Sequence, residues 1–235
     1  MTLFPCAKIN LGLNVVSKRD DGYHNLETVF YPIPLCDALE VTVMDSDFPS
    51  DFPCDLKITG NSIECNEQEN LVVKAYNILS KDFTLPRIHT HLHKQIPSQA
   101  GLGGGSSDAA YMIRLLNECF HLNIEEAEME RYAARLGADC AFFISAKPAF
   151  ATGIGEILSP VETVDNQLKG HHILLVKPNV NITTKDAFAH IVPKKPSKSC
   201  RDIVGQPVET WKDELANDFE TSVFKKYPEL SKIKD

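Results

Sequence analysis

The chain has 235 residues, of which 43% are hydrophobic and 24% are charged, and its formal net charge is −8. These values are typical of a globular protein with one large domain or two small ones. The acidic balance argues against a nucleic-acid partner, because proteins that grip a phosphate backbone usually carry a basic surplus. No apolar run approaches the roughly 20 residues of a membrane span. Lys8 interrupts the apolar N-terminus, so we expect neither a membrane anchor nor a signal peptide.

The cysteines indicate a reducing compartment. There are seven of them, an odd number, and they are widely spaced without a C-x-x-C pair. This pattern favours free thiols over a disulfide framework or a zinc ribbon. We therefore expect a cytoplasmic protein.

The first half of the chain predicts strands followed by helices. In chain order, strands are expected over 6–16, over 23–35 after a turn at Asp20-Asp21-Gly22, over 38–44 and over 87–96, and a helix over 71–79. A further helix follows residue 105, capped by Ser106, Ser107 or Asp108. Strands and helices mix without regular alternation, which predicts an α+β fold rather than a doubly wound sheet.

A helix is predicted from Asn123 to the terminating Gly137, and three elements are predicted after it. Residues 149–161 are strand-like, and Ile173–Val176 read as a short buried strand. A last helix carries the apolar residues Trp211, Leu215, Phe219 and Val223. The basic residues near 194–201 are expected to form a solvated loop.

The strongest local signal is a glycine loop between a predicted strand and a predicted helix. It consists of Pro97, Ser98, Gln99, Ala100, Gly101, Leu102, Gly103, Gly104, Gly105, Ser106 and Ser107. Glycine lets the backbone approach a ligand closely, and successive amides can then form an anion-binding nest. The N-terminus of the following helix adds free N–H groups and its dipole. The Walker A and dinucleotide patterns both fail here, since neither Gly-Lys-Ser/Thr nor G-x-G-x-x-G is present. The loop nevertheless predicts a phosphate cradle.

Several further motifs extend this signal over nearly the whole chain. They are Ala7-Lys8-Ile9-Asn10-Leu11, Asp21-Gly22-Tyr23-His24, Gly137-Ala138-Asp139, Gly153-Ile154-Gly155-Glu156, Asn217-Asp218-Phe219-Glu220 and the segment 178–184. With the glycine loop, this set resembles the GHMP kinase superfamily of small-molecule kinases. The Asp-Gly-Tyr-His segment is similar to the branch that phosphorylates the C2 hydroxyl of 4-diphosphocytidyl-2-C-methyl-D-erythritol, in non-mevalonate isoprenoid synthesis.

The resemblance implies a two-domain architecture. The N-terminal domain, 1–153, would be like ribosomal protein S5 domain 2 and would bind ATP. The C-terminal domain, 154–235, would be ferredoxin-like and lie on the substrate side. Members of the family continue into another glycine-rich segment of Ser-Gly-Ser-Gly type, which is not found before Asp235, so the second domain is expected to be incomplete.

The resemblance also implies roles for individual residues. Lys8 and Asp139 would be catalytic, Asp139 by accepting the proton of the acceptor hydroxyl or by orienting it. Residues 97–107 would bind ATP, with Ser106 or Ser107 near Mg²⁺. The implied substrate-binding residues are Asn10, Tyr23, His24, Thr184 and Phe188, with Tyr23 and Phe188 sandwiching the cytosine and His24 contacting its edge.

Other interpretations remain open at the level of sequence. Taken alone, Lys8 and Asp139 each read as an exposed charge or an ion-pair partner, and Asp139 also as a helix cap. Tyr23-His24 reads as part of a hairpin. A strand face with His89, His91 and His93 could bind a metal, although no carboxylate or cysteine nearby completes a set. The rival functions are another GHMP kinase and a nucleotide-binding module without catalysis. We expect small-molecule partners, and a monomer or a weak homodimer.

Overall fold

The computed structural model describes residues 1–62, 65–180 and 182–234, and only the backbone of Thr184 and Lys185. The chain forms two compact units. The first comprises residues 1–9 and 32–147, and the second comprises residues 10–31 and 148–235. Helices and strands mix in both units, so the predicted α+β class is confirmed.

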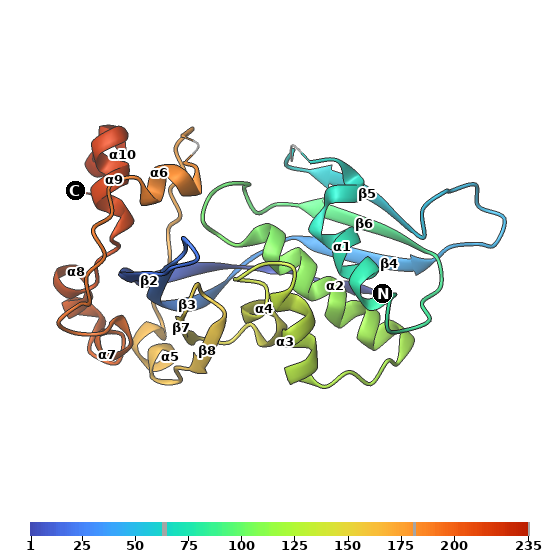
Figure 1. The fold of residues 1–235 in the computed structure, drawn as a ribbon, viewed down its shortest axis with the longest axis horizontal. Helices are drawn as coiled ribbons and strands as arrows, with labels where there is room; N and C mark the ends of the chain where they lie inside the picture. The colour runs from blue at the N-terminus through green and yellow to red at the C-terminus, as the bar shows by residue number, and fades with distance from the viewer. Residues whose placement is uncertain (63–64, 181, 235) are drawn as a thin grey trace. The chain divides into compact units, whose positions relative to one another are not determined.

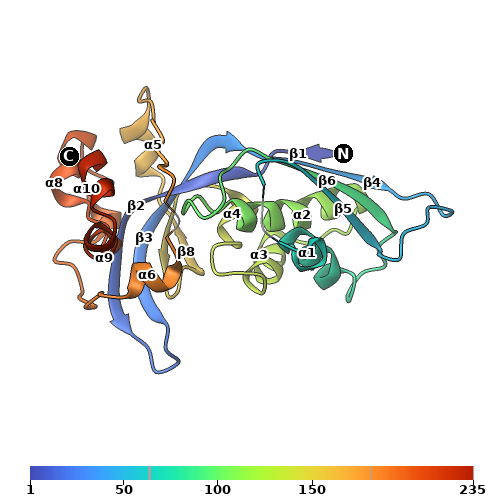
Figure 2. The same cartoon turned by 90° about the horizontal axis from the view of Figure 1, so that it is seen from above.

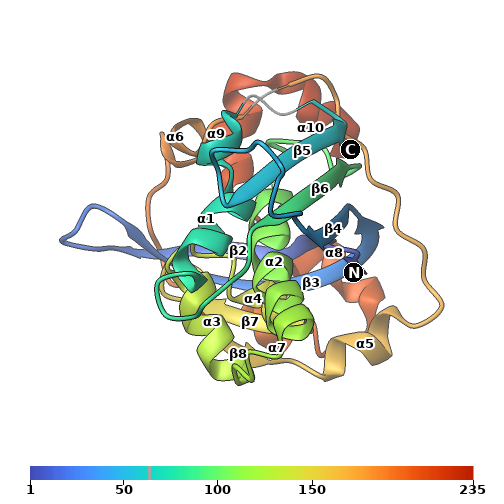
Figure 3. The same cartoon turned by 90° about the vertical axis from the view of Figure 1, so that its right-hand side faces the viewer.

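The sheet of the first unit has the strand order β1-β4-β6-β5. Its strands are β1 (Thr2–Leu3), β4 (Ala38–Val43), β5 (Cys54–Gly60) and β6 (Ile88–Lys94). Figure 3 shows β5, β6 and β4 side by side. β6 pairs antiparallel with β4 and parallel with β5, so it is a central strand. Its polar and apolar residues alternate, and this places Ile88, Thr90 and Leu92 on the buried face.

Helices cover that buried face. They are α1 (Leu71–Leu79), α2 (Gly104–Phe120), α3 (Glu126–Ala134) and α4 (Phe142–Ser145), preceded by the 3-10 helix η1 (Glu67–Glu69). Figure 2 shows α1 to α4 on one side of the sheet. The α2 stripe packs inward, since Ala109, Met112, Ile113 and Leu116 are fully buried. The predicted helix over 71–79 is confirmed with its bounds.

The start of α2 differs from the prediction. The helix begins at Gly104, and Gly103 takes the N-cap position in the left-handed conformation, without a side-chain cap. The Gly103 carbonyl accepts a hydrogen bond from the Ser107 N–H at 2.8 Å, so the backbone closes the first turn by itself. Ser106 and Ser107 therefore lie inside the first turn instead of capping it.

The second unit is built on a sheet with the order β2-β3-β7-β8. Its strands are β2 (Cys6–Lys18), β3 (His24–Cys36), β7 (Ala149–Thr152) and β8 (Ile157–Pro160). Its helices are α5 (Thr163–Leu168), α6 (Thr184–Phe188), α7 (Cys200–Ile203), the 3-10 helix η2 (Val208–Thr210), α8 (Trp211–Glu214), α9 (Phe219–Lys226) and α10 (Pro228–Lys234). α9 packs against α6 and α10 (Figure 1). The core of the second unit contains Val29, Val164, Ile203, Val204 and Trp211.

Two predicted elements of the second half are wrong. Residues 173–176 form no strand, and Leu174 is 86% exposed. An apolar run becomes a buried strand only where a neighbouring strand pairs with it, and none does so among the described residues. The predicted last helix is interrupted: Leu215 is extended, and Asn217 forms a parallel bridge with Leu13. Pairing with β2 thus replaces the helical turn between α8 and α9.

The compact units are discontinuous in sequence, because β2 and β3 each contribute residues to both. The predicted domains, 1–153 and 154–235, are continuous, and that boundary stays a prediction. Among the described residues, no helix is long and apolar enough to span a bilayer.

Candidate active site

Lys8 and Asp139 meet in the first unit. Lys8 lies on β2 with its side chain only 6% exposed, and its Nζ is 3.6 Å from Asp139 Oδ2. The Lys8 N–H donates to the Leu102 carbonyl of the glycine loop at 2.9 Å. Burial lowers the pKa of Lys8, and the Asp139 carboxylate partly offsets this effect by favouring the ammonium form. The two residues predicted to be catalytic are therefore neighbours and share an electrostatic environment.

Asp139 is presented by the turn between α3 and α4. α3 ends at Ala134, and the Cys140 N–H then donates to the Gly137 carbonyl at 3.1 Å. The Asp139 side chain is 34% exposed, so it remains accessible from solvent. Burial raises the pKa of the adjacent Cys140 thiol to about 11, which keeps it protonated near neutral pH. Asp139 is thus the ionisable side chain of this turn suited to acid–base chemistry.

The glycine loop encloses a pocket of about 380 Å³. Residues 97–106 line it, together with Asn70, Leu71 and Lys94. Gly101 and Gly103 have φ values of +71° and +70°, a region that favours glycine. α2 begins directly at this loop without a side-chain cap. The first N–H groups of a helix have no acceptor within the helix, so they can bind an anion. The glycine loop thus forms a hollow at the N-terminus of a 17-residue helix, and its role as a phosphate cradle stays a prediction.

Gly103 lies between the glycine loop and Lys8, one of the two residues predicted to be catalytic. A Cβ at this position would lie 2.7 Å from Phe143 Cζ and 3.2 Å from Lys8 Cγ. Side-chain carbons do not approach that closely, so only glycine allows the loop to pack against Lys8 and α4. This close approach holds the loop beside the Lys8–Asp139 pair.

The oxygen atoms near the loop fit a magnesium ion held mainly by phosphates. Among the described residues, no group of three His, Cys, Asp or Glu side chains is arranged to hold a metal ion. The histidines of β6 therefore form no such group either. Ser106 lines the pocket and is half-buried, whereas Ser107 is buried and its Oγ has no hydrogen-bond partner within the described chain. Mg²⁺ often binds through few protein groups plus substrate phosphates. Of the two predicted contacts, Ser106 has the better access.

The predicted substrate-binding residues lie in the second unit. Asn10 Nδ2 donates to Thr28 Oγ1 at 2.8 Å, which orients the Asn10 amide. Tyr23 follows the predicted turn at the tip of the β2–β3 hairpin and is 61% exposed. Its N–H donates to Asp21 Oδ1 at 3.0 Å, so the turn is closed by a local side chain. Thr184 begins α6, but its side chain lies outside the described part of the chain.

His24 and Phe188 form a stacked pair. Their ring centroids are 4.9 Å apart with an interplanar angle of 20°. The edge of Phe219 contacts Phe188 at a centroid distance of 4.8 Å. His24 therefore covers one face of Phe188, and the sandwich of a cytosine between Tyr23 and Phe188 stays a prediction. The contact of Phe219 with Phe188 was not predicted, because in the sequence Phe219 reads as part of an apolar helical stripe.

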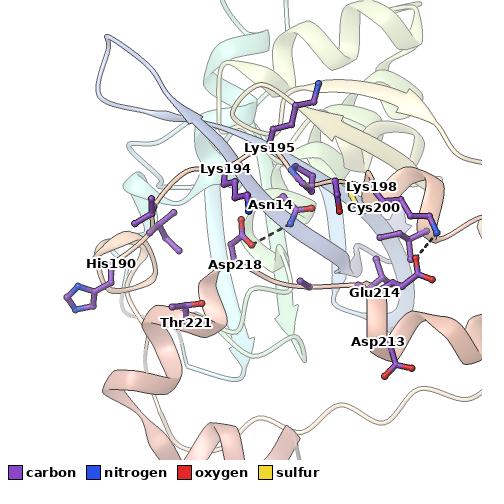
Figure 4. A pocket seen from close by; sticks show the side chains of 17 residues that line it. Asn14, His190, Lys194, Lys195, Lys198, Cys200, Asp213, Glu214, Asp218 and Thr221 are labelled. Atoms are coloured by element: carbon purple, nitrogen blue, oxygen red, sulfur yellow. Dashed lines mark hydrogen bonds and ion pairs between the residues drawn. The ribbon is translucent and has the colours of Figure 1, made fainter.

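A second hollow of about 790 Å³ lies elsewhere in the second unit. Figure 4 shows its lining, in which Lys198 is paired with Glu214 and Asn14 with Asp218. Three lysines and three carboxylates line it in equal number: Lys194, Lys195, Lys198, Asp213, Glu214 and Asp218. This balance gives no preference for an anion. The glycine-loop pocket differs in that the start of α2 contributes to its lining, and the phosphate site stays predicted there.

Fold and site together define a small-molecule kinase of the GHMP type. Residues 70–147 match the family described as "GHMP kinases N terminal domain". A mevalonate kinase from Methanococcus jannaschii shares the fold, with a TM-score of 0.53 at 12% identity over 72% of this chain and 58% of that one.

Whole-chain similarity narrows the class. A 4-diphosphocytidyl-2-C-methyl-D-erythritol kinase from Bacteroides fragilis is 55% identical over 234 residues, which cover 100% of this chain and 83% of the relative. Its namesake from Bacteroides thetaiotaomicron is 53% identical over the same shares. A crystal structure of 4-(cytidine 5'-diphospho)-2C-methyl-D-erythritol kinase matches with a TM-score of 0.76 at 28% identity, over 99% of this chain and 81% of that one. The chain belongs to the 4-diphosphocytidyl-2-C-methyl-D-erythritol kinase family.

Proposed function

We propose that the chain transfers the γ-phosphoryl group of ATP to the C2 hydroxyl of 4-diphosphocytidyl-2-C-methyl-D-erythritol, giving the 2-phosphate and ADP. The reaction belongs to non-mevalonate isoprenoid precursor synthesis in the cytoplasm. The observation that carries the proposal is the Lys8–Asp139 pair, 3.6 Å apart, beside a glycine-loop pocket in a chain 55% identical to a kinase of that name.

The catalytic pair supplies what phosphoryl transfer needs. Asp139 accepts or orients the proton of the C2 hydroxyl, whose oxygen then attacks the γ-phosphorus while the bond to the β-phosphate oxygen breaks. The Lys8 ammonium stabilises negative charge on the attacking oxygen. Its burial strengthens this effect, because charge interactions grow in a low dielectric.

The glycine loop and the start of α2 hold the phosphates. The loop amides and the helix N-terminus bind negative oxygens, and the left-handed glycines allow the backbone to approach them. Ser106, with Ser107 behind it, would contact a magnesium ion. When bound, that ion neutralises charge on the β- and γ-phosphates.

Residues of the second unit bind the cytidine part of the substrate. Tyr23 offers an exposed aromatic face on a hairpin tip, and the His24–Phe188 stack offers a ring with hydrogen-bonding nitrogens beside a further aromatic surface. Asn10 and Thr184 position the substrate. An amide fixed by Thr28, as in Asn10, presents a defined donor or acceptor to a ligand.

The position of the new phosphate tests the proposal. The C2 carbon carries a methyl group and no hydrogen, so a phosphate on its oxygen has no proton three bonds away. The proposal predicts one uncoupled phosphomonoester signal by phosphorus NMR of the product. A triplet or doublet would place the phosphate on C1 or C3 and contradict the assignment.

A further inference from the structure

A buried cluster of three charged side chains lies under the glycine loop. It joins Asp37, the single residue between β3 and β4, Lys94 at the end of β6, and Asp108 near the start of α2. Their side chains are only 0%, 4% and 4% exposed. Lys94 Nζ donates to Asp37 Oδ2 and, at 2.6 Å, to Asp108 Oδ2. Removing three charges from water is costly, so such a cluster persists only where its geometry is well satisfied.

Asp37 holds the point at which the chain leaves the sheet for the loop. Its Oδ1 accepts the N–H groups of Gln95 and, at 2.8 Å, Ile96, directly before the loop begins at Pro97. Its own N–H donates to the Pro5 carbonyl at 2.9 Å. Asp37 therefore fixes both the backbone that enters the loop and the lysine beside it.

The cluster also touches the loop from below. A Cβ on Gly104 would lie 3.0 Å from Ile96 Cγ2 and 3.3 Å from Lys94 Nζ. Lys94, Ile96 and Asp108 all line the glycine-loop pocket. Both ends of the loop, β6 and α2, are thus tied through Lys94 (Figure 1 shows the loop between them).

We propose that Asp37, Lys94 and Asp108 form a positioning cluster that sets the glycine loop in its nucleotide-binding conformation, with Asp37 as its anchor. The inference rests on the proposed function, because it assumes that the loop binds ATP. None of the three residues needs to touch the reacting atoms. Their role is to hold the backbone amides that do the binding.

Asp108 ties the same lysine to α2. Its Oδ2 accepts the hydrogen bond from Lys94 Nζ, while its Oδ1 has no hydrogen-bond partner among the described residues. The strand that enters the loop and the helix that leaves it therefore share one buried ammonium group.

The test is calorimetric titration of the full chain with a non-hydrolysable ATP analogue and Mg²⁺, together with initial-rate kinetics. Asp37→Asn should raise Kd and the KM for ATP about tenfold or more, because it displaces the loop without touching the ligand. Its kcat at saturating ATP and its KM for the second substrate should stay within about twofold. Asp108→Asn, a neutral side chain of the same shape, weakens the tie between Lys94 and α2 and should raise Kd and the KM for ATP in the same direction. Asp82→Asn is the matched control, since Asp82 accepts a hydrogen bond from Tyr132 outside the pocket.

The outcomes separate this inference from the function. A purely structural role would lower the melting temperature of Asp37→Asn and leave the KM for ATP unchanged, which would overturn the proposal. If Asp37→Asn does not fold, Asp108→Asn decides, and a Kd for the analogue and a KM for ATP equal to those of the unaltered chain would overturn the proposal. Failure of the unaltered chain to bind the analogue would remove the proposed function, and this inference with it.

Discussion

Lys8 Nζ lies 3.6 Å from Asp139 Oδ2, and the two residues come from opposite ends of the first unit's sequence. Lys8 is buried on β2, while Asp139 sits at an accessible turn before α4. One member of the pair is thus shielded from water and the other faces it. This asymmetry suits a fixed positive charge next to a carboxylate that exchanges a proton with substrate.

Replacing the carboxylate should stop turnover and spare binding. Asp139→Asn removes the proton acceptor while keeping the shape of the side chain, so we expect kcat to fall on the order of 10²–10⁴-fold. Nucleotide affinity should stay within a few-fold. Initial rates of ADP formation measure the first and calorimetry the second, with Asp82→Asn as a control of full activity. Normal turnover in Asp139→Asn would remove the residue from the mechanism.

The pH dependence of activity should reflect the protonation of Lys8. Burial lowers its pKa below the ordinary 10.5, so the ammonium is present below the lowered value and is lost as the pH rises through it. Activity that depends on this charge should show an alkaline limb below pH 10.5. Between the lowered pKa of folded Lys8 and the ordinary value of 10.5, the unfolded chain binds more protons than the folded chain. The free energy of unfolding should therefore rise with pH in that range.

Lys8→Arg supplies the matched variant. Arginine stays protonated at all accessible pH values, so the alkaline limb should disappear even where the larger side chain reduces kcat. An unchanged alkaline limb in Lys8→Arg would assign it to another group.

Replacing His24 should change the KM for the cytidine substrate but not the KM for ATP. His24→Ala removes the stack on Phe188 and a hydrogen-bonding ring, each of which contributes on the order of 1 kcal/mol, so the KM for the cytidine substrate should rise about thirtyfold. The KM for ATP should not change. His172→Ala, at an exposed position in the same unit, is the control. An equal rise in both KM values would make His24 a structural residue.

Two glycines of the loop should differ in their response to alanine. Gly101 and Gly103 share a left-handed conformation, which costs alanine about 1 kcal/mol. Nothing lies within 4 Å of a Cβ at Gly101, whereas one at Gly103 meets Phe143 at 2.7 Å. Gly101→Ala should lower the melting temperature by about 2–4 °C. Gly103→Ala should lower it further and also reduce kcat, because it displaces Lys8. Equal effects would contradict the crowding at Gly103.

Local patterns in the sequence were sufficient for much of the fold. Alternation placed β6, and helical spacing placed α1, because each pattern directly reflects one buried face. Ile173–Val176 was mispredicted because burial depends on a partner strand that local sequence does not specify. The last helix was predicted as continuous because its apolar spacing carries no sign of the bridge between Asn217 and Leu13.

The site was predictable in its motifs but not in its supports. The glycine loop is recognisable from composition, and the resemblance to a kinase family paired Lys8 with Asp139. The salt bridges of Lys94 with Asp37 and Asp108 depend on tertiary packing, since these residues lie on three separate elements. The Phe188–Phe219 contact likewise requires α6 to meet α9.

The decisive measurement is ADP release from this 235-residue chain with ATP, Mg²⁺ and 4-diphosphocytidyl-2-C-methyl-D-erythritol. Mevalonate, homoserine and galactose serve as competing acceptors, and Asp139→Asn as the inactive control. We expect ADP only with the cytidine substrate. ADP formation with another acceptor, or binding of the cytidine substrate without any turnover, would contradict it.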